Sequence, residues 1–162
     1  MKHSIYPGSF DPFTNGHLDI LTRAARLFDT VTVGVLENAS KTPFFSTQER
    51  LEMIEEIVAA AGLEGVRVEA FDGLTIEFAR ARGAQAIIRG LRAVSDYEYE
   101  LQLASLNKTL APEIETVFFM ADSNNAYLSS SIVKEIGRYG GDISAFVPPV
   151  AHQKIVERLQ AK

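Results

Sequence analysis

The sequence contains no cysteine, so it has neither a disulfide framework nor a thiolate nucleophile. This composition suits a reducing compartment. No apolar run reaches the length of a membrane span, and the N-terminus lacks the basic region and apolar stretch of a secretion signal. We therefore expect a cytoplasmic protein without a membrane partner.

An excess of positive charge is also missing. Sixteen basic and twenty-one acidic residues give a net charge of -5, so the surface as a whole does not favour nucleic acid. Any polyanionic ligand must therefore be held at a local site. The 162 residues are 46% hydrophobic, which is enough for one well-buried core and predicts a single domain over residues 1–162.

Several common motifs are absent as well. There is no P-loop of the form G-x-x-x-x-G-K-S/T, and no G-x-G-x-x-G follows an expected strand. The three histidines are scattered, and no His/Asp/Glu cluster has metal-ligand spacing, so we assign no metal ligands. The sequence leaves a Ser-His-Asp triad open, although no serine lies in a G-x-S-x-G elbow.

What the chain does show is an alternation of strands and helices. Apolar runs predict strands that end at Tyr6 and cover 31–36, 66–71, 86–88 and 116–120. Helical patterns follow at 18–28, 46–62, 75–82 and 97–110, after 129–131, and from Pro149. The alternation predicts an α/β fold in which a five-stranded parallel sheet has helices on both faces.

The segment from Gly8 to His17 joins the first strand to the first helix. Its glycines permit tight turns or close approach to a ligand, and its prolines cannot continue a ladder. His17 falls in the first helical turn, where unpaired N–H groups favour an anion. The segment therefore predicts a phosphate site. The structural alternative is an ordinary turn in which His17 caps its own backbone.

Polar residues follow every expected strand, at 8–17, 38–41, 72–75, 89–92 and 122–131. Because the carboxyl ends of parallel strands lie along one edge of a sheet, these loops should meet. One phosphate-bearing ligand above the sheet would account for all of them.

Three segments resemble bacterial phosphopantetheine adenylyltransferases. They are Y-P-G-S-F-D-P with T-N-G-H at 6–17, I-R-G-L-R with D-Y-E-Y-E at 88–100, and L-S-S-S at 128–131. The T-x-G-H portion alone indicates only the wider nucleotidyltransferase superfamily, whereas I-R-G-L-R is much more specific. The resemblance covers nearly the whole chain.

The resemblance implies a Rossmann-like fold and transfer of AMP from ATP to 4′-phosphopantetheine, which gives dephospho-CoA and pyrophosphate in coenzyme A biosynthesis. It also implies Mg²⁺, a cytoplasmic setting, a homohexamer, and coenzyme A as a candidate feedback inhibitor.

It further implies the site residues, position by position. The ATP site falls on Ser9, Phe10, His17, Gly90, Leu91, Arg92, Glu100, Asn125, Ala126, Tyr127, Leu128, Ser129, Ser130 and Ser131. The phosphopantetheine site falls on Ser9, Lys41, Thr75 and Arg89.

The residue types suit these roles. His17 is expected to stabilise charge on the α-phosphate, with Lys41 and Arg89 holding the attacking phosphate, so these three form the expected catalytic set. Arg92 and the serines 129–131 would hold the β- and γ-phosphates. Two positions depart from the family pattern: Ser9 replaces a threonine, and Asn125 stands where an aromatic would stack on adenine.

Structural alternatives stay open for most of these positions. Arg89 and Arg92 would otherwise be solvated or pair with Asp96 and Glu100, and Lys41 would be a surface charge. The serines 129–131 and Thr75 would serve only to begin helices. The apolar residues 97–103 would be core or oligomer contacts.

Two functional alternatives also remain. One is another nucleotidyltransferase with the same T-x-G-H chemistry, acting on nicotinate mononucleotide or transferring CMP. The other is a non-catalytic nucleotide-binding module on the same fold.

Overall fold

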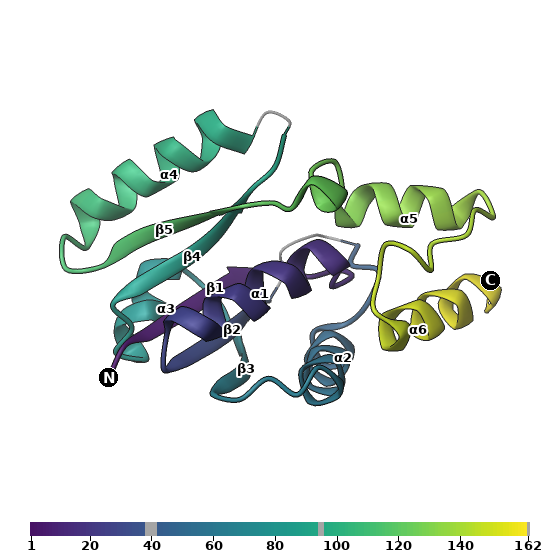
Figure 1. Cartoon of the computed structure of the whole chain (residues 1–162), viewed down its shortest axis with the longest axis horizontal. Helices are drawn as coiled ribbons and strands as arrows, with labels where there is room; N and C mark the ends of the chain where they lie inside the picture. The colour runs from purple at the N-terminus through teal and green to yellow at the C-terminus, as the bar shows by residue number, and fades with distance from the viewer. Residues whose placement is uncertain (38–41, 94–95, 162) are drawn as a thin grey trace.

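The computed structural model describes residues 1–37, 42–93 and 96–161 (Figure 1). It contains a five-stranded, all-parallel sheet in the order β3-β2-β1-β4-β5. The strands are β1 (His3–Gly8), β2 (Thr30–Leu36), β3 (Val66–Phe71), β4 (Ala86–Leu91) and β5 (Glu115–Met120). From β1, the strands β2 and β3 follow on one side of the sheet. The chain then crosses back, so that β4 and β5 lie on the other side of β1.

Helices connect these strands. They are α1 (Asn15–Leu27), α2 (Thr47–Ala60), α3 (Thr75–Ala81), α4 (Asp96–Leu110), α5 (Ser130–Arg138) and α6 (Pro149–Gln160). A short 3-10 turn, η1 (Ser123–Asn125), precedes α5. Figure 1 shows α5 and α6 together at one end of the molecule, away from the N-terminus. The predicted α/β fold with helices on both faces of the sheet is confirmed.

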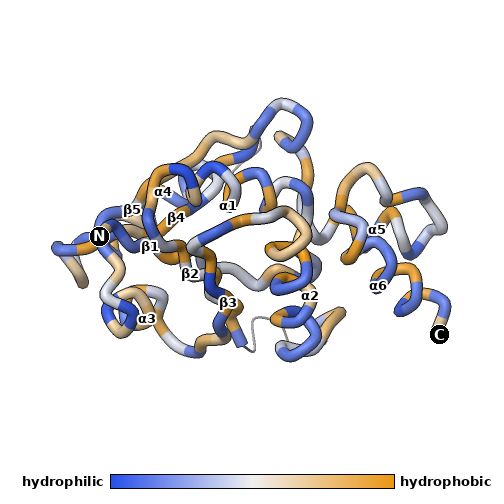
Figure 2. Tube along the Cα trace, turned by 60° about the horizontal axis from the view of Figure 1, so that its bottom comes forward, coloured by the Kyte–Doolittle hydropathy of each residue, from blue (hydrophilic) through white to orange (hydrophobic). Residues whose placement is uncertain are grey.

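The core has two parts because side chains alternate between the two faces of each strand. On one face, Val31, Val33 and Val35 pack with buried residues of α1, α2 and α6. On the other face, Ile5 and Ile87 pack with buried residues of α3. Figure 2 shows hydrophobic and hydrophilic colours alternating along α5 and α6, as expected for helices with one face on the core and one in solvent.

Two strands extend beyond their predicted ends. In β1, Pro7 is paired with Gly34 and Gly8 with Val35. In β4, Arg89 is paired with Phe118 and Gly90 with Phe119, so these two residues belong to the strand and not to the loop after it. The sequence hides these ends because their residues are proline, glycine and arginine rather than the apolar residues that mark buried strands.

The predicted helix starts are confirmed where capping chemistry marks them. Ser46 and Glu49 form the expected capping box of α2, and Pro149 occupies the first turn of α6. The Ser129 hydroxyl accepts a hydrogen bond from the backbone N–H of Ile132 and so caps α5. Within the described part of the chain, no helix is both long and apolar enough to cross a membrane.

Candidate active site

A cavity of about 330 Å³ lies at the carboxyl ends of β1 and β4, the two neighbouring strands between which the chain reverses its direction of sheet building. Ligands of open parallel sheets bind at such switch points. Most residues assigned to the site from sequence line this cavity: Ser9, Phe10, His17, Arg89, Gly90, Arg92, Glu100, Asn125, Leu128, Ser129, Ser130 and Ser131.

Other assigned residues lie elsewhere. Leu91 is buried in β4, and Tyr127 is largely exposed; these two, Ala126 and Thr75 do not line the cavity. Thr75 begins α3, beyond the end of the edge strand β3. Lys41 lies outside the residues that the structure describes. The roles given to these residues therefore stay predictions.

His17 is held by the capping box of α1. Its Nδ1 accepts a hydrogen bond of 2.9 Å from the backbone N–H of Thr14, and its own backbone N–H donates to the Thr14 hydroxyl. The expected alternative, in which the histidine caps its own helix, is thus part of the structure. Since a backbone N–H can only donate, Nδ1 carries no proton and a neutral ring has its proton on Nε2. The same contact that caps α1 leaves Nε2–H as a donor.

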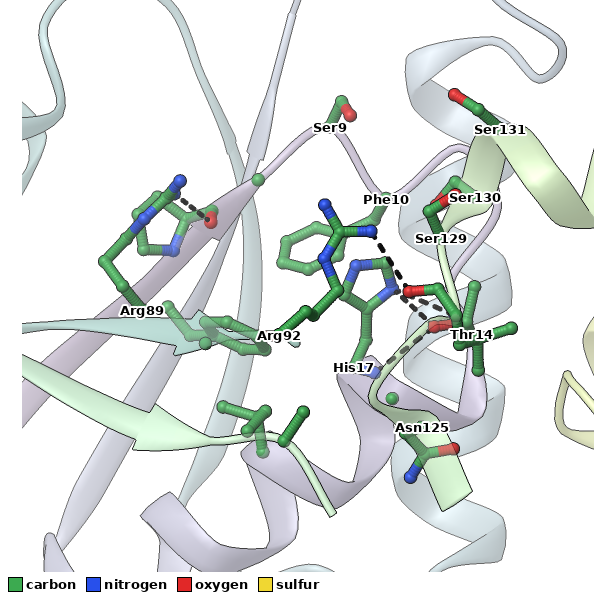
Figure 3. A pocket seen from close by; sticks show the side chains of 18 of the residues that line it. Ser9, Phe10, Thr14, His17, Arg89, Arg92, Asn125, Ser129, Ser130 and Ser131 are labelled. Atoms are coloured by element: carbon green, nitrogen blue, oxygen red, sulfur yellow. Dashed lines mark hydrogen bonds between the residues drawn. The ribbon is translucent and has the colours of Figure 1, made fainter. Parts of the chain in front are cut away.

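The surroundings of His17 keep the ring neutral. Burial, together with the positive charges of Arg92 and Arg89, lowers the pKa of His17 from 6.5 to about 3. The ring packs edge-on against Phe10, with centroids 4.9 Å apart, and tilted against Phe13. Figure 3 shows the imidazole and the Arg92 side chain on the same side of the cavity.

Phe10 makes the turn after β1 in an unexpected way. It adopts the left-handed region, with φ of 50°, which is uncommon for a bulky residue. Its buried ring packs on Tyr6, Phe13 and His17. A Cβ at Gly8 would approach this ring to 2.9 Å, so Gly8 is required by the packing of Phe10 and not by a positive φ of its own. The sequence predicted a tight turn or close approach to a ligand at Gly8, whereas the group that approaches Gly8 closely in the structure is the Phe10 ring.

Arg89 is paired across the cavity wall with α4. Its Nε donates to the Glu100 carboxylate at 2.6 and 3.0 Å, and its Nη1 donates to the Pro7 carbonyl at 3.4 Å. Glu100 is buried, whereas one third of the Arg89 side chain is exposed. The ion pair foreseen as a structural alternative is present, and it directs the guanidinium along the cavity that Arg89 lines.

The start of α5 forms the opposite wall (Figure 3). Arg92 donates from Nη1 to the Leu128 carbonyl at 3.2 Å. The Ser130 hydroxyl donates to the Pro12 carbonyl at 2.7 Å, which ties this helix to the loop after β1. The first-turn N–H groups of α5 and the Arg92 guanidinium therefore belong to one cavity, and both favour anions.

The cavity is also lined by Tyr6, Pro7, Gly8, Thr14, Gly16, Ile20 and Ala121. Gly8, Thr14 and Gly16 belong to the segment from Gly8 to His17 that was predicted as a phosphate site, whereas Tyr6, Pro7, Ile20 and Ala121 were not assigned to the site. Burial raises the pKa of Tyr6, so its phenol is neutral. Thr14 was detectable, since Thr followed three residues later by a side chain with an acceptor resembles a capping box. Ile20 was not, because an apolar residue on a helix stripe carries no sign of lining a site.

The cytidylyltransferase-like family matches residues 5–136 of the chain. A phosphopantetheine adenylyltransferase of Lachnoclostridium phytofermentans is 53% identical over 162 residues, 100% of this chain and 98% of that protein. One from Alkaliphilus metalliredigens is 51% identical over 158 residues, 98% of this chain and 99% of that protein. The chain belongs to the phosphopantetheine adenylyltransferase family. This membership confirms the resemblance and the prediction of an enzyme of the nucleotidyltransferase class.

Solved structures agree on the fold. A bifunctional NMN adenylyltransferase/ADP ribose pyrophosphatase from Francisella tularensis superposes with a TM-score of 0.76 at 16% identity, over 98% of this chain and 50% of that chain. A putative nicotinate-nucleotide adenylyltransferase from Vibrio parahaemolyticus gives 0.70 at 14% identity, over 96% and 99%. This phosphopantetheine adenylyltransferase family member therefore has a nucleotidyltransferase fold.

Proposed function

We propose that this chain transfers AMP from ATP to 4′-phosphopantetheine in the cavity between β1, β4 and the start of α5, giving dephospho-CoA and pyrophosphate. The observation that carries the proposal is the orientation of His17, whose Nδ1 is occupied by the Thr14 N–H while Arg89 and Arg92 line the same cavity. Together these groups supply a neutral donor and two cations for a reaction between phosphates.

The reaction needs little covalent chemistry from the protein. A phosphate oxygen of phosphopantetheine attacks the α-phosphorus of ATP, the bond from that phosphorus to the bridging oxygen breaks, and pyrophosphate departs with the electron pair. The attacking phosphate dianion needs no general base. Catalysis then depends on in-line positioning and on stabilising charge at the α-phosphate and the leaving group.

His17 is assigned to the α-phosphate. Its Nε2–H donates to a nonbridging oxygen, where charge develops in the transition state. The ring stays neutral near pH 7 because its pKa is about 3, so it keeps its Nε2 proton and takes up no second proton there. It therefore acts as a fixed hydrogen-bond donor and not as an acid or a base.

The α5 wall is assigned to the β- and γ-phosphates. Arg92 and the first-turn N–H groups of α5 offer charge and fixed donors there. Asn125, Leu128 and the η1 turn would border the adenosine, with no aromatic stacking from Asn125. The departing pyrophosphate would thus remain in a positive environment.

Arg89 is assigned to the acceptor phosphate. Glu100 and the Pro7 carbonyl hold its Nε and Nη1, so the guanidinium is oriented before substrate binds. Ser9, in the loop after β1, adds a hydroxyl to the same cavity. Lys41 and Thr75 complete the proposed acceptor site on the strength of the resemblance alone.

Magnesium is part of the proposal as the counter-ion of ATP. Among the described residues, no group of three His, Cys, Asp or Glu side chains is arranged to hold a metal ion. The cavity offers cations and hydroxyls, which fit a metal held by phosphate oxygens and water, the ligands that Mg²⁺ accepts readily. When bound, the ion would neutralise part of the triphosphate charge.

The remaining partners are proposals too. We place the protein in the cytoplasm, in keeping with its lack of cysteine. Coenzyme A contains both the phosphopantetheine and the adenylate parts of the product, so it should compete for the same cavity as a feedback inhibitor. The homohexamer is implied by the resemblance, and an apolar stripe along α4, with Tyr99, Leu106 and Leu110 exposed and Leu103 half-buried, offers a surface for contact between copies.

The decisive test is pyrophosphate release from ATP with a panel of acceptors. We expect 4′-phosphopantetheine to react and nicotinate mononucleotide to react at least ~10⁴-fold less efficiently, because buried polar groups would be left unpaired. Pantetheine without its phosphate should not react, because it lacks the nucleophilic oxygen. Similar kcat/KM values for the two phosphorylated acceptors would overturn the assignment of the acceptor.

A further inference from the structure

Arg50 is an arginine of α2 that is buried almost completely, with 3% of its surface exposed. Its guanidinium makes four hydrogen bonds to three segments of the chain. Nη1 donates to the Ser9 carbonyl at 2.7 Å and to the Leu36 carbonyl at 3.1 Å, Nε donates to the Phe45 carbonyl, and Nη2 donates to the Thr47 hydroxyl. Arg50 thus joins the loop after β1, the end of β2 and the start of α2.

Asp11 completes this arrangement from the other side. Its buried carboxylate accepts hydrogen bonds from the backbone N–H groups of Phe44, at 2.7 Å, and Phe45, at 2.8 Å. Both backbone polar groups of Phe45 are therefore occupied, its N–H by Asp11 and its carbonyl by Arg50. The segment 9–11 and the segment 44–45 are fastened together at two points.

The geometry requires an arginine. Burying a cation is costly unless each of its donors finds a partner, and the planar guanidinium meets acceptors in three directions at once. A lysine carries the same charge on a single nitrogen, so it cannot reach the Ser9, Leu36 and Phe45 carbonyls together. The side chain is thus matched to the arrangement of these loops.

The contact with Ser9 connects Arg50 to the cavity, although Arg50 does not line it. The Ser9 carbonyl belongs to the peptide that leads into Phe10, the residue with φ of 50° whose ring packs edge-on against His17. Fixing this peptide fixes the Ser9 hydroxyl and the Phe10 ring. We infer that Arg50, together with Asp11, is a positioning residue that sets the Ser9–Phe10 turn, and through it His17, against the reacting phosphates.

This inference rests on the proposed function of the cavity. Its test is Arg50→Lys, which keeps the charge and loses the guanidinium fork. Because small misplacements of reacting groups have large effects on rate, we expect kcat to fall roughly 10- to 100-fold with less than about 3-fold change in the KM for ATP. Arg50→Met, which loses the charge as well, should be more severe. The ¹⁵N shifts of the His17 ring should move in Arg50→Lys.

The matched control is Arg158→Lys. Arg158 donates to the Phe44 carbonyl and pairs with Glu49, so it holds the same segment from α6 without reaching Ser9. Its replacement should lower stability while kcat per folded molecule and the His17 shifts stay at wild-type values. If Arg50→Lys also kept the wild-type kcat per folded molecule, Arg50 would contribute to stability alone and the inference would be wrong.

Asp11→Asn supplies a second, independent variant should Arg50→Lys fold poorly. It keeps one acceptor oxygen for the backbone N–H groups of Phe44 and Phe45. We expect it to lower kcat, as Arg50→Lys does. The double variant should lose less than the product of the single effects, since both act on one connection. Multiplicative effects would contradict a shared role. A wild-type enzyme that releases no pyrophosphate with phosphopantetheine would count instead against the proposed function.

Discussion

The two ring nitrogens of His17 have separate tasks, one structural and one assigned to catalysis. Nδ1 accepts the Thr14 N–H within the capping box of α1, and Nε2 is left for the ligand. Because a glutamine at this helix position can accept the same N–H, the two tasks can be separated by mutation.

We expect His17→Gln to keep the cap through its amide oxygen and to replace the fixed ring Nε2–H by a mobile amide NH₂, so that kcat falls ~10²-fold or more while the affinity for ATP changes little. His17→Ala should show the same loss of kcat and, in addition, lose about 0.5–1 kcal/mol of stability. Steady-state kinetics and urea denaturation measure the two effects separately. Near-normal turnover of His17→Ala, which has no side-chain donor, would contradict the assignment of His17 to the α-phosphate.

The low pKa of His17 predicts how it responds to pH. A pKa of about 3 against an ordinary value of 6.5 means that the unfolded chain binds more protons than the folded chain between these values. His17 therefore favours folding above pH 6.5, and this contribution is lost as the pH falls toward 3. An NMR titration should show a neutral ring with its proton on Nε2 from pH 5 to 8. A midpoint near 6.5 would contradict it.

Arg89 and Glu100 allow a similar separation of stability from function. Arg89→Ala should leave the buried Glu100 carboxylate unpaired and lower stability by about 1–3 kcal/mol. The double variant Arg89→Ala/Glu100→Gln should regain much of this loss because the buried charge is gone. Neither variant should use 4′-phosphopantetheine well. Calorimetry with each substrate tests this, and recovery of acceptor binding in the double variant would contradict the assignment of Arg89.

At the residue scale, the sequence predicted what a side chain offers but not which partner it finds. His17 and Arg89 stood out because their types suit phosphate and they follow predicted strands. Arg50 and Asp11 did not, because an arginine within an amphipathic helix looks like a solvated charge until its acceptors, brought together from distant segments, are known.

At the scale of elements, helix starts were predictable because capping depends on residues three positions apart. The ends of β1 and β4 were not, because they depend on pairing with other strands. Arg89 and Gly90 consequently lie on a strand of the sheet, which holds this side of the cavity more rigidly than a loop would.

Two serine caps make a matched pair of variants. Ser46 caps α2 and Ser129 caps α5, each by accepting a backbone N–H at 3.1 Å. Replacement of either by alanine should lower stability by about 1 kcal/mol. Only Ser129→Ala should also raise the KM for ATP, since α5 borders the cavity and α2 does not. Thermal denaturation and initial rates test this. Equal KM values for ATP in the two variants would contradict the assignment of α5 to the phosphates.

At the scale of the whole molecule, alternation of strands and helices predicted the parallel sheet and the edge where the loops meet. The strand order was beyond sequence reasoning, because nothing local in the chain states that β4 returns beside β1. That order explains why the loops after β1 and β4 border one cavity while Thr75, which follows the edge strand β3, does not.

Assembly is the last property at this scale. Tyr99, Leu106 and Leu110 are spaced to share one side of α4. Each residue is more than half exposed, at 55%, 62% and 55%. An apolar stripe of this kind on a folded chain indicates contact with another protein surface, and the proposed partner is a second copy of this chain.

We therefore expect Leu106→Glu to break the assembly, because it places a charge in the middle of the stripe. Light scattering should give about six times 17.8 kDa for the wild type and a smaller mass for the variant. The matched control is Leu27→Glu at the end of α1, where a leucine is 63% exposed but lies outside α4. It should keep the wild-type mass. A wild type that is monomeric, or a Leu106→Glu variant that still assembles, would reject the α4 stripe as the contact between copies.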